Sequence, residues 1–249
     1  MNKYLRHEEI LHILKERQFT TVGYLAKLLY VAPITIRRDL SEMETAGLLK
    51  RSHGGASVLE HQNREVPFEL REQTNATVKA FLGKQAAALL HAGDVVFMDA
   101  STTVLHVIDY LNAEMNLTVV TNSIKALEKL REKHIRCYLT GGVLLENSYA
   151  LIGQLAEQTI SGLYADVCLF STQGITEDGV ITDFSEAETR LRQQMLAHAK
   201  YRIYVFDKTK YGKQYLFRVC HTSEIQKIVT DANINDAIMG ANYPEHTKL

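Results

Sequence analysis

The stretch VVFMDASTTVLHVI, residues 95–108, decides the fold of the larger part of this chain. Four apolar residues are followed by Asp99 and a run of hydroxyl residues, after which apolar positions return at helical spacing. This pattern predicts a strand that runs through a polar turn into a helix. The unpaired N–H groups at a helix N-terminus can bind an anion, although Ser and Thr are also ordinary helix caps. By itself, the stretch is more typical of a cap.

Five further apolar runs of strand length occur along the chain, and amphipathic stretches separate most of them. They are residues 117–120, 135–139, 166–170, 202–206 and 225–229. Near-continuous apolar strands that alternate with helices indicate a parallel sheet covered by helices on both faces. We therefore predict a Rossmann-like, mostly parallel α/β domain.

Polar residues follow five of the six predicted strands. The carboxyl ends of parallel strands meet at one edge of the sheet, where ligands bind at the topological switch point. Hydroxyl groups, glycine amides and a lysine suit a phosphate, while Asp and Asn side chains suit sugar hydroxyls. The predicted effector-binding residues are Asp99, Ser101, Thr102, Thr103, Thr121, Asn122, Gly141, Gly142, Gln173, Gly174, Asp207 and Lys210.

The first segment of the chain has the pattern of three short helices. The third helix is predicted in VAPITIRRDLSEMETAG, residues 31–47, where Pro33 suits the first turn and Gly47 the position after the last one. At 100° per residue, apolar side chains share one face and the paired arginines lie on the other. Three helices with arginines on the free face of the third predict a helix-turn-helix.

The next residues, LLKRSHGGA at 48–56, predict a small hairpin, and together these elements form a winged helix-turn-helix. Arginines near the start of such a helix bind guanine edges or DNA phosphates. The alternative for the two helix arginines is a solvated face paired with Asp39 or Glu42, and for the hairpin residues it is plain turn chemistry. The predicted DNA-binding residues are Ile34, Thr35, Arg37, Arg38, Ser41, Arg51 and His53.

The distribution of charge supports two domains. Residues 1–56 hold nine Lys and Arg against six Asp and Glu, whereas the rest of the 249 residues holds nineteen against twenty-three. A small basic segment joined to a larger acidic one is typical of a DNA-binding domain fused to another domain. No apolar run approaches the roughly 18 residues of a membrane span, and the N-terminus lacks the apolar centre of a signal peptide. We expect a cytoplasmic protein with no membrane partner.

The cysteines and histidines predict no metal site. Cys137, Cys168 and Cys220 are odd in number and widely spaced, and two of them lie in apolar strand-like runs, which favours buried thiols over disulfides. The ten histidines form no pair at a spacing typical of metal ligands. We expect no metal and no other cofactor.

Two motifs of the first segment carry a resemblance to a known family. Ile34-Thr-Ile-Arg-Arg-Asp-Leu40, followed by His53-Gly-Gly-Ala56, resembles the signature of the DeoR family of bacterial transcriptional regulators. The chain departs from it at Ala32, where the family usually has a capping Ser. The resemblance implies a winged helix-turn-helix domain, predicted here at residues 1–57.

The resemblance extends over nearly the whole chain. The family's D-x-G-T-T appears as Asp99–Thr103 with Ser101 in place of Gly, its T-N-S as Thr121–Ser123, and its D-x-S-K-x-G as Asp207–Gly212. It implies an effector domain that is related in fold to ribose-phosphate isomerases and binds phosphorylated sugars. We place this domain at residues 76–249, after a linker at 58–75 that becomes a helix.

One further segment, Glu186–Arg190, is similar to the family's E-A-x-x-K and leaves two interpretations open. It is either a solvated charged face of a helix or a contact to the ligand.

The leading interpretation of function is a DNA-binding repressor of carbohydrate-utilisation genes whose affinity for double-stranded operator DNA is controlled by a phosphorylated sugar. The alternative is a sugar-phosphate isomerase with an appended DNA-binding head, although no compact acid-rich catalytic loop is visible. A nucleotide-binding module is disfavoured, because both glycine-rich phosphate-loop patterns are absent. Helix-turn-helix proteins usually read spaced half-sites, so we expect a homodimer or homotetramer. For a regulator of this kind we expect no catalytic residues.

Overall fold

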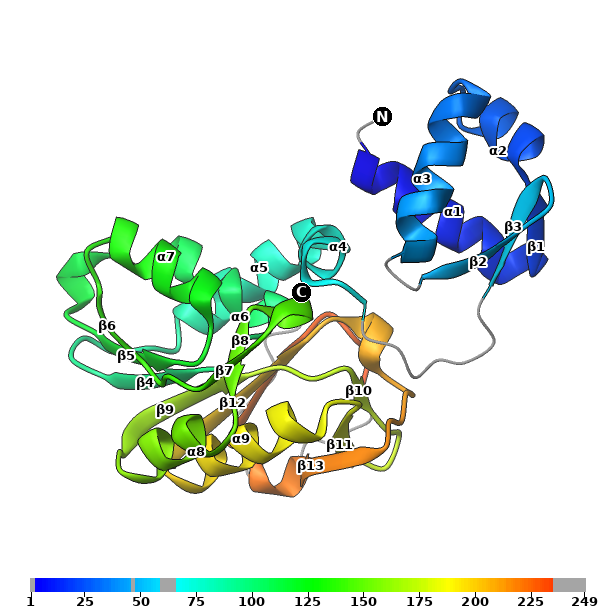
Figure 1. Cartoon of the computed structure of the whole chain (residues 1–249). Coiled ribbons are helices and arrows are strands. Elements are labelled where there is room, and N and C mark those ends of the chain that lie inside the picture. The colour runs from blue at the N-terminus through cyan, green and yellow to red at the C-terminus, as the bar shows by residue number, and fades with distance from the viewer. Residues whose placement is uncertain (1–2, 46–47, 59–65, 235–249) are drawn as a thin grey trace. The chain divides into compact units, whose positions relative to one another are not determined.

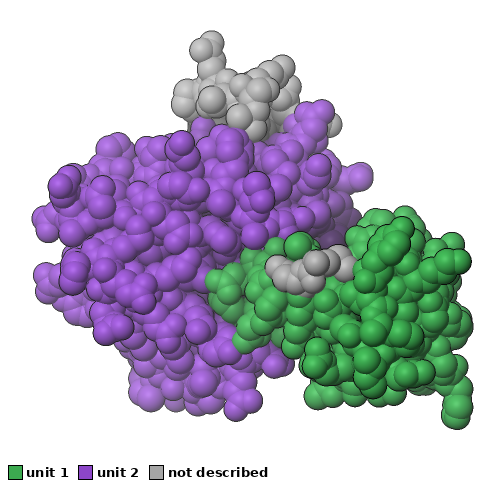
Figure 2. Space-filling view, turned by 90° about the horizontal axis from the view of Figure 1, so that it is seen from above, with its two compact units in different colours: residues 1–74 green, residues 75–249 purple. Residues whose placement is uncertain are grey.

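The computed structural model describes residues 3–45, 48–58 and 66–234. The chain divides into two compact units, residues 1–74 and residues 75–249 (Figure 2). Gly47 lies outside the described residues. Within the described ranges, no helix has both the length and the apolar character needed to cross a membrane.

The first unit contains three helices, a three-stranded sheet and one further helix. Its elements are α1 (Lys3–Arg17), β1 (Phe19–Thr21), α2 (Val22–Leu28), α3 (Pro33–Thr45), β2 (Leu49–Ser52), β3 (Gly55–Val58) and α4 (Phe68–Gln73). The sheet has the order β1-β3-β2, and its strands are antiparallel. Helix α4 lies in the second half of the predicted linker, and residues 59–65 of that linker lie outside the described residues.

The apolar residues that were predicted to share one face of the third helix, α3, are the residues that are buried. Ile36, Leu40 and Met43 of α3 are buried in a core with side chains from α1 and α2. The Oγ1 of Thr21 accepts a hydrogen bond from the Tyr24 N–H at 3.2 Å and caps α2, as Thr does in many helices. The three-helix arrangement predicted for this unit is therefore confirmed.

The second unit is an α/β domain. Its helices and strands are α5 (Ala76–Ala87), β4 (Val95–Met98), α6 (Thr102–Leu105), β5 (Thr118–Thr121), α7 (Ile124–Glu132), β6 (Arg136–Leu139), β7 (Val143–Leu145), β8 (Ala150–Ile152), α8 (Gln154–Ser161), β9 (Ala165–Phe170), β10 (Gly174–Ile175), β11 (Val180–Asp183), α9 (Glu186–Ala197), β12 (Ala199–Phe206), β13 (Phe217–His221) and β14 (Lys227–Thr230). Short 3₁₀ turns lie at Ile108–Tyr110, Ala113–Met115, Glu146–Ser148, Lys208–Lys210 and Thr222–Glu224.

The main sheet contains all six predicted strands. Its order is β14-β12-β9-β4-β5-β6, and every neighbouring pair is parallel. Helices α5 and α7 cover one face, and α8 and α9 cover the other (Figure 1). The chain moves in one direction from β4 to β6 and then returns to β9 on the other side of β4, so the strand order reverses between β4 and β9.

The sequence did not predict the smaller antiparallel elements of this unit. Strands β7 and β8 form a hairpin, while β10, β11 and β13 form a three-stranded sheet. These strands have two to five residues each, which is too short for an alternating pattern to stand out.

The core below the carboxyl edge of the sheet is aromatic. Tyr204 stacks on Phe170 and Phe206, with ring centroids 4.9 and 4.8 Å apart. Burial raises the pKa of the Tyr204 phenol, whose oxygen lies 2.7 Å from the Oγ1 of Thr172 in the loop after β9. The aromatic core therefore holds a loop of the predicted ligand site in place.

The three cysteines are free thiols. Cys168 and Cys220 are buried, and Cys137 is half-buried. Burial raises the pKa of the Cys137 thiol to about 11, so this thiol is protonated and unreactive at neutral pH. Burial was predicted from the apolar runs around Cys137 and Cys168, and of these two only Cys168 is fully buried.

Candidate functional site

Helix α3 presents a free face with the two predicted arginines. The side chains of Ile34, Arg37 and Arg38 are exposed, while those of Thr35 and Ser41 are half-buried. The two carboxylates that could have paired with these arginines are bound to α1 instead. Asp39 accepts hydrogen bonds from Arg6, and Glu42 pairs with Lys3. The pairing of both carboxylates with α1 disfavours the alternative of a self-paired helix face, and both arginine side chains are exposed to solvent.

A buried charge cluster fixes α3 against α1. Asp39 is 1% exposed and lies 2.5 Å from Nε of Arg6, 3.0 Å from its Nη2 and 3.2 Å from Nε2 of His7. Burial alone would raise the pKa of Asp39, but the hydrogen bonds from Arg6 and His7 lower it below its ordinary value. The two arginines that precede Asp39 in the sequence, Arg37 and Arg38, are thereby held on the exposed face of α3.

The wing packs on the end of the recognition helix. The N–H of Arg51 donates to Oε1 of Glu44 at 2.8 Å, and its guanidinium donates to Oγ of Ser41 at 3.2 Å. The turn between β2 and β3 is His53–Gly54, where the positive φ of 79° at Gly54 suits glycine. The side chains of Arg51 and His53 are exposed, which leaves room for contacts to DNA phosphates.

His7 should make this unit sensitive to mild acid. Burial lowers the pKa of His7 below its ordinary value of 6.5, so the unfolded chain binds the proton more strongly. Its contribution to stability is present above about pH 6.5 and is lost as the pH falls through the folded pKa. Between about pH 7.5 and 5.5 the midpoint of thermal unfolding of this unit should fall, and it should fall less in His7→Gln. An equal fall in both proteins would show that His7 does not titrate in this range.

In the second unit, Asp99 connects the two loops at the point where the strand order reverses. Its Oδ1 accepts hydrogen bonds from the N–H and the Oγ of Ser101, at 3.2 and 2.6 Å. Its Oδ2 accepts from the N–H of Ser171, at 3.2 Å, and from Nε of Arg192, at 2.8 Å. The predicted ligand residue Asp99 thus organises the loops after β4 and β9.

Arg192 of α9 completes a buried ion triad. It is 4% exposed, and its Nη1 lies 3.2 Å from Oδ2 of Asp183 at the end of β11. Burial alone would lower the pKa of Arg192, but Asp99 and Asp183 raise it above its ordinary value, so the side chain stays charged. The triad joins the loop after β4 to both α9 and the smaller sheet.

Two lysines reach the same edge of the sheet. Lys79 of α5 is 4% exposed, and its Nζ donates to Oγ1 of Thr102 at 3.1 Å. Nζ of Lys210 donates to Oε1 of Gln173 at 2.9 Å, which links the loops after β12 and β9. Two ammonium groups among hydroxyl and amide groups make this edge suited to an anion.

Other predicted residues have structural roles. Asp207 is buried and accepts hydrogen bonds from the Thr209 N–H, at 3.0 Å, and from Nδ2 of Asn75, at 3.3 Å. The Oγ1 of Thr121, which is fully buried, accepts from the N–H of Ser123 at 3.1 Å. Thr103 is buried in the first turn of α6.

The predicted glycines allow close approaches of backbone. A Cβ at Gly142 would meet the carbonyl oxygen of Ile152 at 2.5 Å, and a Cβ at Gly174 would meet that of Lys213 at 2.5 Å. Gly141 and Gly142 follow β6, two strands from β4 in the sheet. The structure thus places Gly142 against β8, whereas a Cβ at Gly141 would meet no atom within 4 Å, and neither glycine lies at the switch point.

The segment Glu186–Arg190 forms a solvated charged face. The two side chains are exposed and pair with each other, at 2.7 Å between Oε1 and Nη2. The buried charges of α9 lie two positions further along, at Glu188 and Arg192. The sequence did contain a signal for which face of α9 is buried. Leu191 and Met195 are apolar and lie on that face, and residues 188 and 192 share it at helical spacing.

Two family models match the two units of the chain. Residues 6–62 match the DeoR-like helix-turn-helix domain, and residues 74–232 match the DeoR C terminal sensor domain. The chain is 32% identical to the HTH-type transcriptional regulator GolR of Listeria innocua, over 96% of this chain and 94% of that protein. It is 31% identical to the lactose phosphotransferase system repressor of Staphylococcus epidermidis, over 94% of each. Ribose 5-phosphate isomerase A from Methanocaldococcus jannaschii is similar over 55% of each chain, with 14% identity and a TM-score of 0.41.

A helix-turn-helix unit followed by an α/β sensor unit defines a DNA-binding transcriptional regulator that responds to a small molecule. The chain belongs to the DeoR family of such regulators, as its two sequence motifs indicated. It is a regulator and not an enzyme, so the isomerase alternative is wrong.

Proposed function

We propose that this chain is a repressor of carbohydrate-utilisation genes and that a phosphorylated sugar controls its affinity for operator DNA. The observation that carries the proposal is the pair of ammonium groups, Lys79 and Lys210, at the carboxyl edge of the sheet. A phosphate there receives charge-assisted hydrogen bonds. Ser101 and Thr102 supply hydroxyl groups at the same loop.

The mechanism is thermodynamic linkage between the two units. An effector that binds one arrangement of the DNA-binding units better than another changes the affinity for DNA. Bound DNA changes the affinity for the effector by the same free energy. Two half-sites require two DNA-binding units, so the form that binds the operator is a homodimer or homotetramer. The protein acts in the cytoplasm, where a bacterial operator is found.

The domain boundaries belong to the same proposal. A DNA-binding domain at residues 1–57 acts on operator DNA through α3 and the wing, and residues 76–249 hold the sensor site. A hydrogen bond from the Asn75 side chain to Asp207 of the sensor domain supports a boundary directly after residue 75.

Removing either free arginine of α3 should weaken operator binding. Loss of a bidentate base contact in Arg37→Ala or Arg38→Ala costs roughly 1–3 kcal/mol, whereas loss of a phosphate contact lowers the slope of binding against salt by about one. Fluorescence anisotropy with operator DNA across salt concentrations distinguishes the two. Arg218→Ala removes the same charge from an exposed position of the second unit and should leave binding unchanged. Wild-type affinity and salt slope in both head variants would refute the assignment of α3.

The effector is tested by thermal shift of the full chain with sugar phosphates. Bound ligand stabilises the folded state by RT ln(1 + [L]/Kd), so a true effector raises the unfolding midpoint with concentration. Ribose 5-phosphate, glucose 6-phosphate, fructose 6-phosphate and fructose 1-phosphate are suitable members, with the unphosphorylated sugars as controls. If no sugar phosphate shifts the midpoint, the proposed effector class is wrong.

A further inference from the structure

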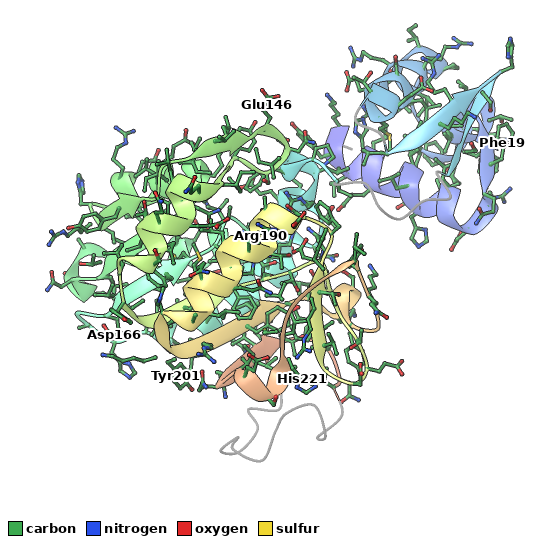
Figure 3. The ribbon with its side chains drawn as sticks, turned by 60° about the horizontal axis from the view of Figure 1, so that its bottom comes forward. Phe19, Glu146, Asp166, Arg190, Tyr201 and His221 are labelled. Carbon is green, nitrogen blue, oxygen red and sulfur yellow. The ribbon has the colours of Figure 1, made fainter. Side chains whose placement is uncertain are left out.

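A small cavity lies between the loops at the sheet edge and helix α9. Its volume is about 10 Å³, which is room for one water-sized group. Asp99, Ala100 and Asn122 line it from the loops after β4 and β5. Side chains of α9 line the other side: Glu188, Leu191, Arg192 and Met195. Figure 3 shows α9 in front of the sheet, with Arg190 labelled on it.

One hydrogen-bonding atom at this cavity has no partner within the described part of the chain. Nδ2 of Asn122 donates to the carbonyl oxygen of Leu151 at 3.1 Å, which fixes the amide plane. Oδ1 of the same side chain is buried and accepts no hydrogen bond, although Asn122 is only 3% exposed. A buried acceptor without a donor costs free energy, so the site is complete only when a donor occupies the cavity.

The charges around the cavity select what that donor can be. Asp99, Asp183 and Glu188 are buried carboxylates, and Arg192 is a buried cation that donates hydrogen bonds to Asp99 and Asp183. Carboxylate groups repel a phosphate but suit a hydroxyl group, which donates to carboxylate and amide oxygens and accepts from a guanidinium.

The loop after β4 therefore has an ammonium group on its α5 side and a cluster of carboxylates around a guanidinium on its α9 side. Thr102 contacts Lys79 of α5, whereas Asp99 contacts Arg192 of α9. The two helices cover opposite faces of the sheet (Figure 1). A ligand lying across this loop has a place for its phosphate on the α5 side and a place for hydroxyl groups on the α9 side.

We infer that Glu188 and Asn122 form a hydroxyl-binding subsite, in which one hydroxyl group of a phosphorylated sugar or polyol occupies the cavity beside α9. The inference depends on the proposed function, because it assigns the second half of the same effector. Glu188 and Asn122 set the choice among sugar phosphates, while the lysines bind the phosphate that all of them share.

The test compares two glutamates of the same helix. In Glu188→Gln, isothermal titration with the sugar phosphate that most stabilises the wild type should give an affinity at least about tenfold weaker, because a charged acceptor is lost. The affinity for inorganic phosphate should stay within about twofold, since the phosphate binds on the α5 side. Glu186→Gln, at an exposed position, should match the wild type for both ligands.

A second variant removes the other side chain of the subsite, so that the conclusion does not depend on one substitution that could disturb the fold. Asn122→Ala should also lose affinity for the sugar phosphate and keep its affinity for inorganic phosphate, with an unfolding transition in the absence of ligand that shows a folded sensor unit. Wild-type affinity for the sugar phosphate in both variants would overturn the subsite and leave the proposed function standing. An equal loss for both ligands would also overturn it, because the residues would then act through the fold. If no sugar phosphate binds the wild type, both proposals fail.

Discussion

Arg192→Met should destabilise the sensor unit by about 3–5 kcal/mol, the cost of leaving a buried ion partner uncompensated. Asp99 and Asp183 would both lose their cation while remaining buried. Domains are stable by roughly 5–15 kcal/mol, so this single change removes a large part of the total. Urea unfolding of the full chain, followed through the sensor transition, measures the effect.

The neighbouring Arg190→Met is the matched control. Arg190 pairs with Glu186 on the exposed face of α9, and a surface pair of this kind contributes about 0–1 kcal/mol. The two variants make the same chemical change two residues apart on one helix. Similar midpoints for both would show that the triad at Arg192 contributes no more than a surface ion pair.

The main sheet could be predicted because burial on both faces leaves a direct trace in the sequence. Runs such as VVFM at residues 95–98 are apolar throughout, and all six such runs are strands of the sheet. Strand β11 could not be found in this way, since it is defined by its pairing with β13, more than thirty residues further along the chain. Hydrophobic pattern reports burial, but it does not report the pairing partner.

The same limit explains which site residues the sequence revealed. Polar residues that end a strand, such as Asp99 and Asn122, are visible because they interrupt an apolar run. Lys79 lies in a helical pattern where lysine is typical of a solvated face, but it is buried and its ammonium group donates to Thr102, 23 residues away. Arg192 bonds Asp99 across 93 residues, which no local pattern can indicate.

Thr102→Asp should abolish the response to the effector. The new carboxylate would lie next to Nζ of Lys79, which contacts the Thr102 hydroxyl at 3.1 Å in the wild type. It would neutralise the cation and repel the phosphate in a site with little water to screen the charges, so affinity for a sugar phosphate should fall by at least about a hundredfold. A negative charge in the first turn of α6 is itself favourable by roughly 0.3–1 kcal/mol, so unfolding is not the expected cause.

Thr102→Asn separates charge from shape, because asparagine has the size of aspartate and is neutral. It should lose less than about tenfold in affinity, the effect of one altered hydrogen bond. Titration calorimetry gives the affinities, and operator binding with and without the sugar phosphate gives the response. If the aspartate mimics the phosphate, operator affinity will be fixed at the value of the effector-bound state; if it only blocks the site, at the value of the free state. In both cases added effector changes nothing, whereas equal affinities for the sugar phosphate in Thr102→Asp and Thr102→Asn would show that no phosphate binds beside Thr102.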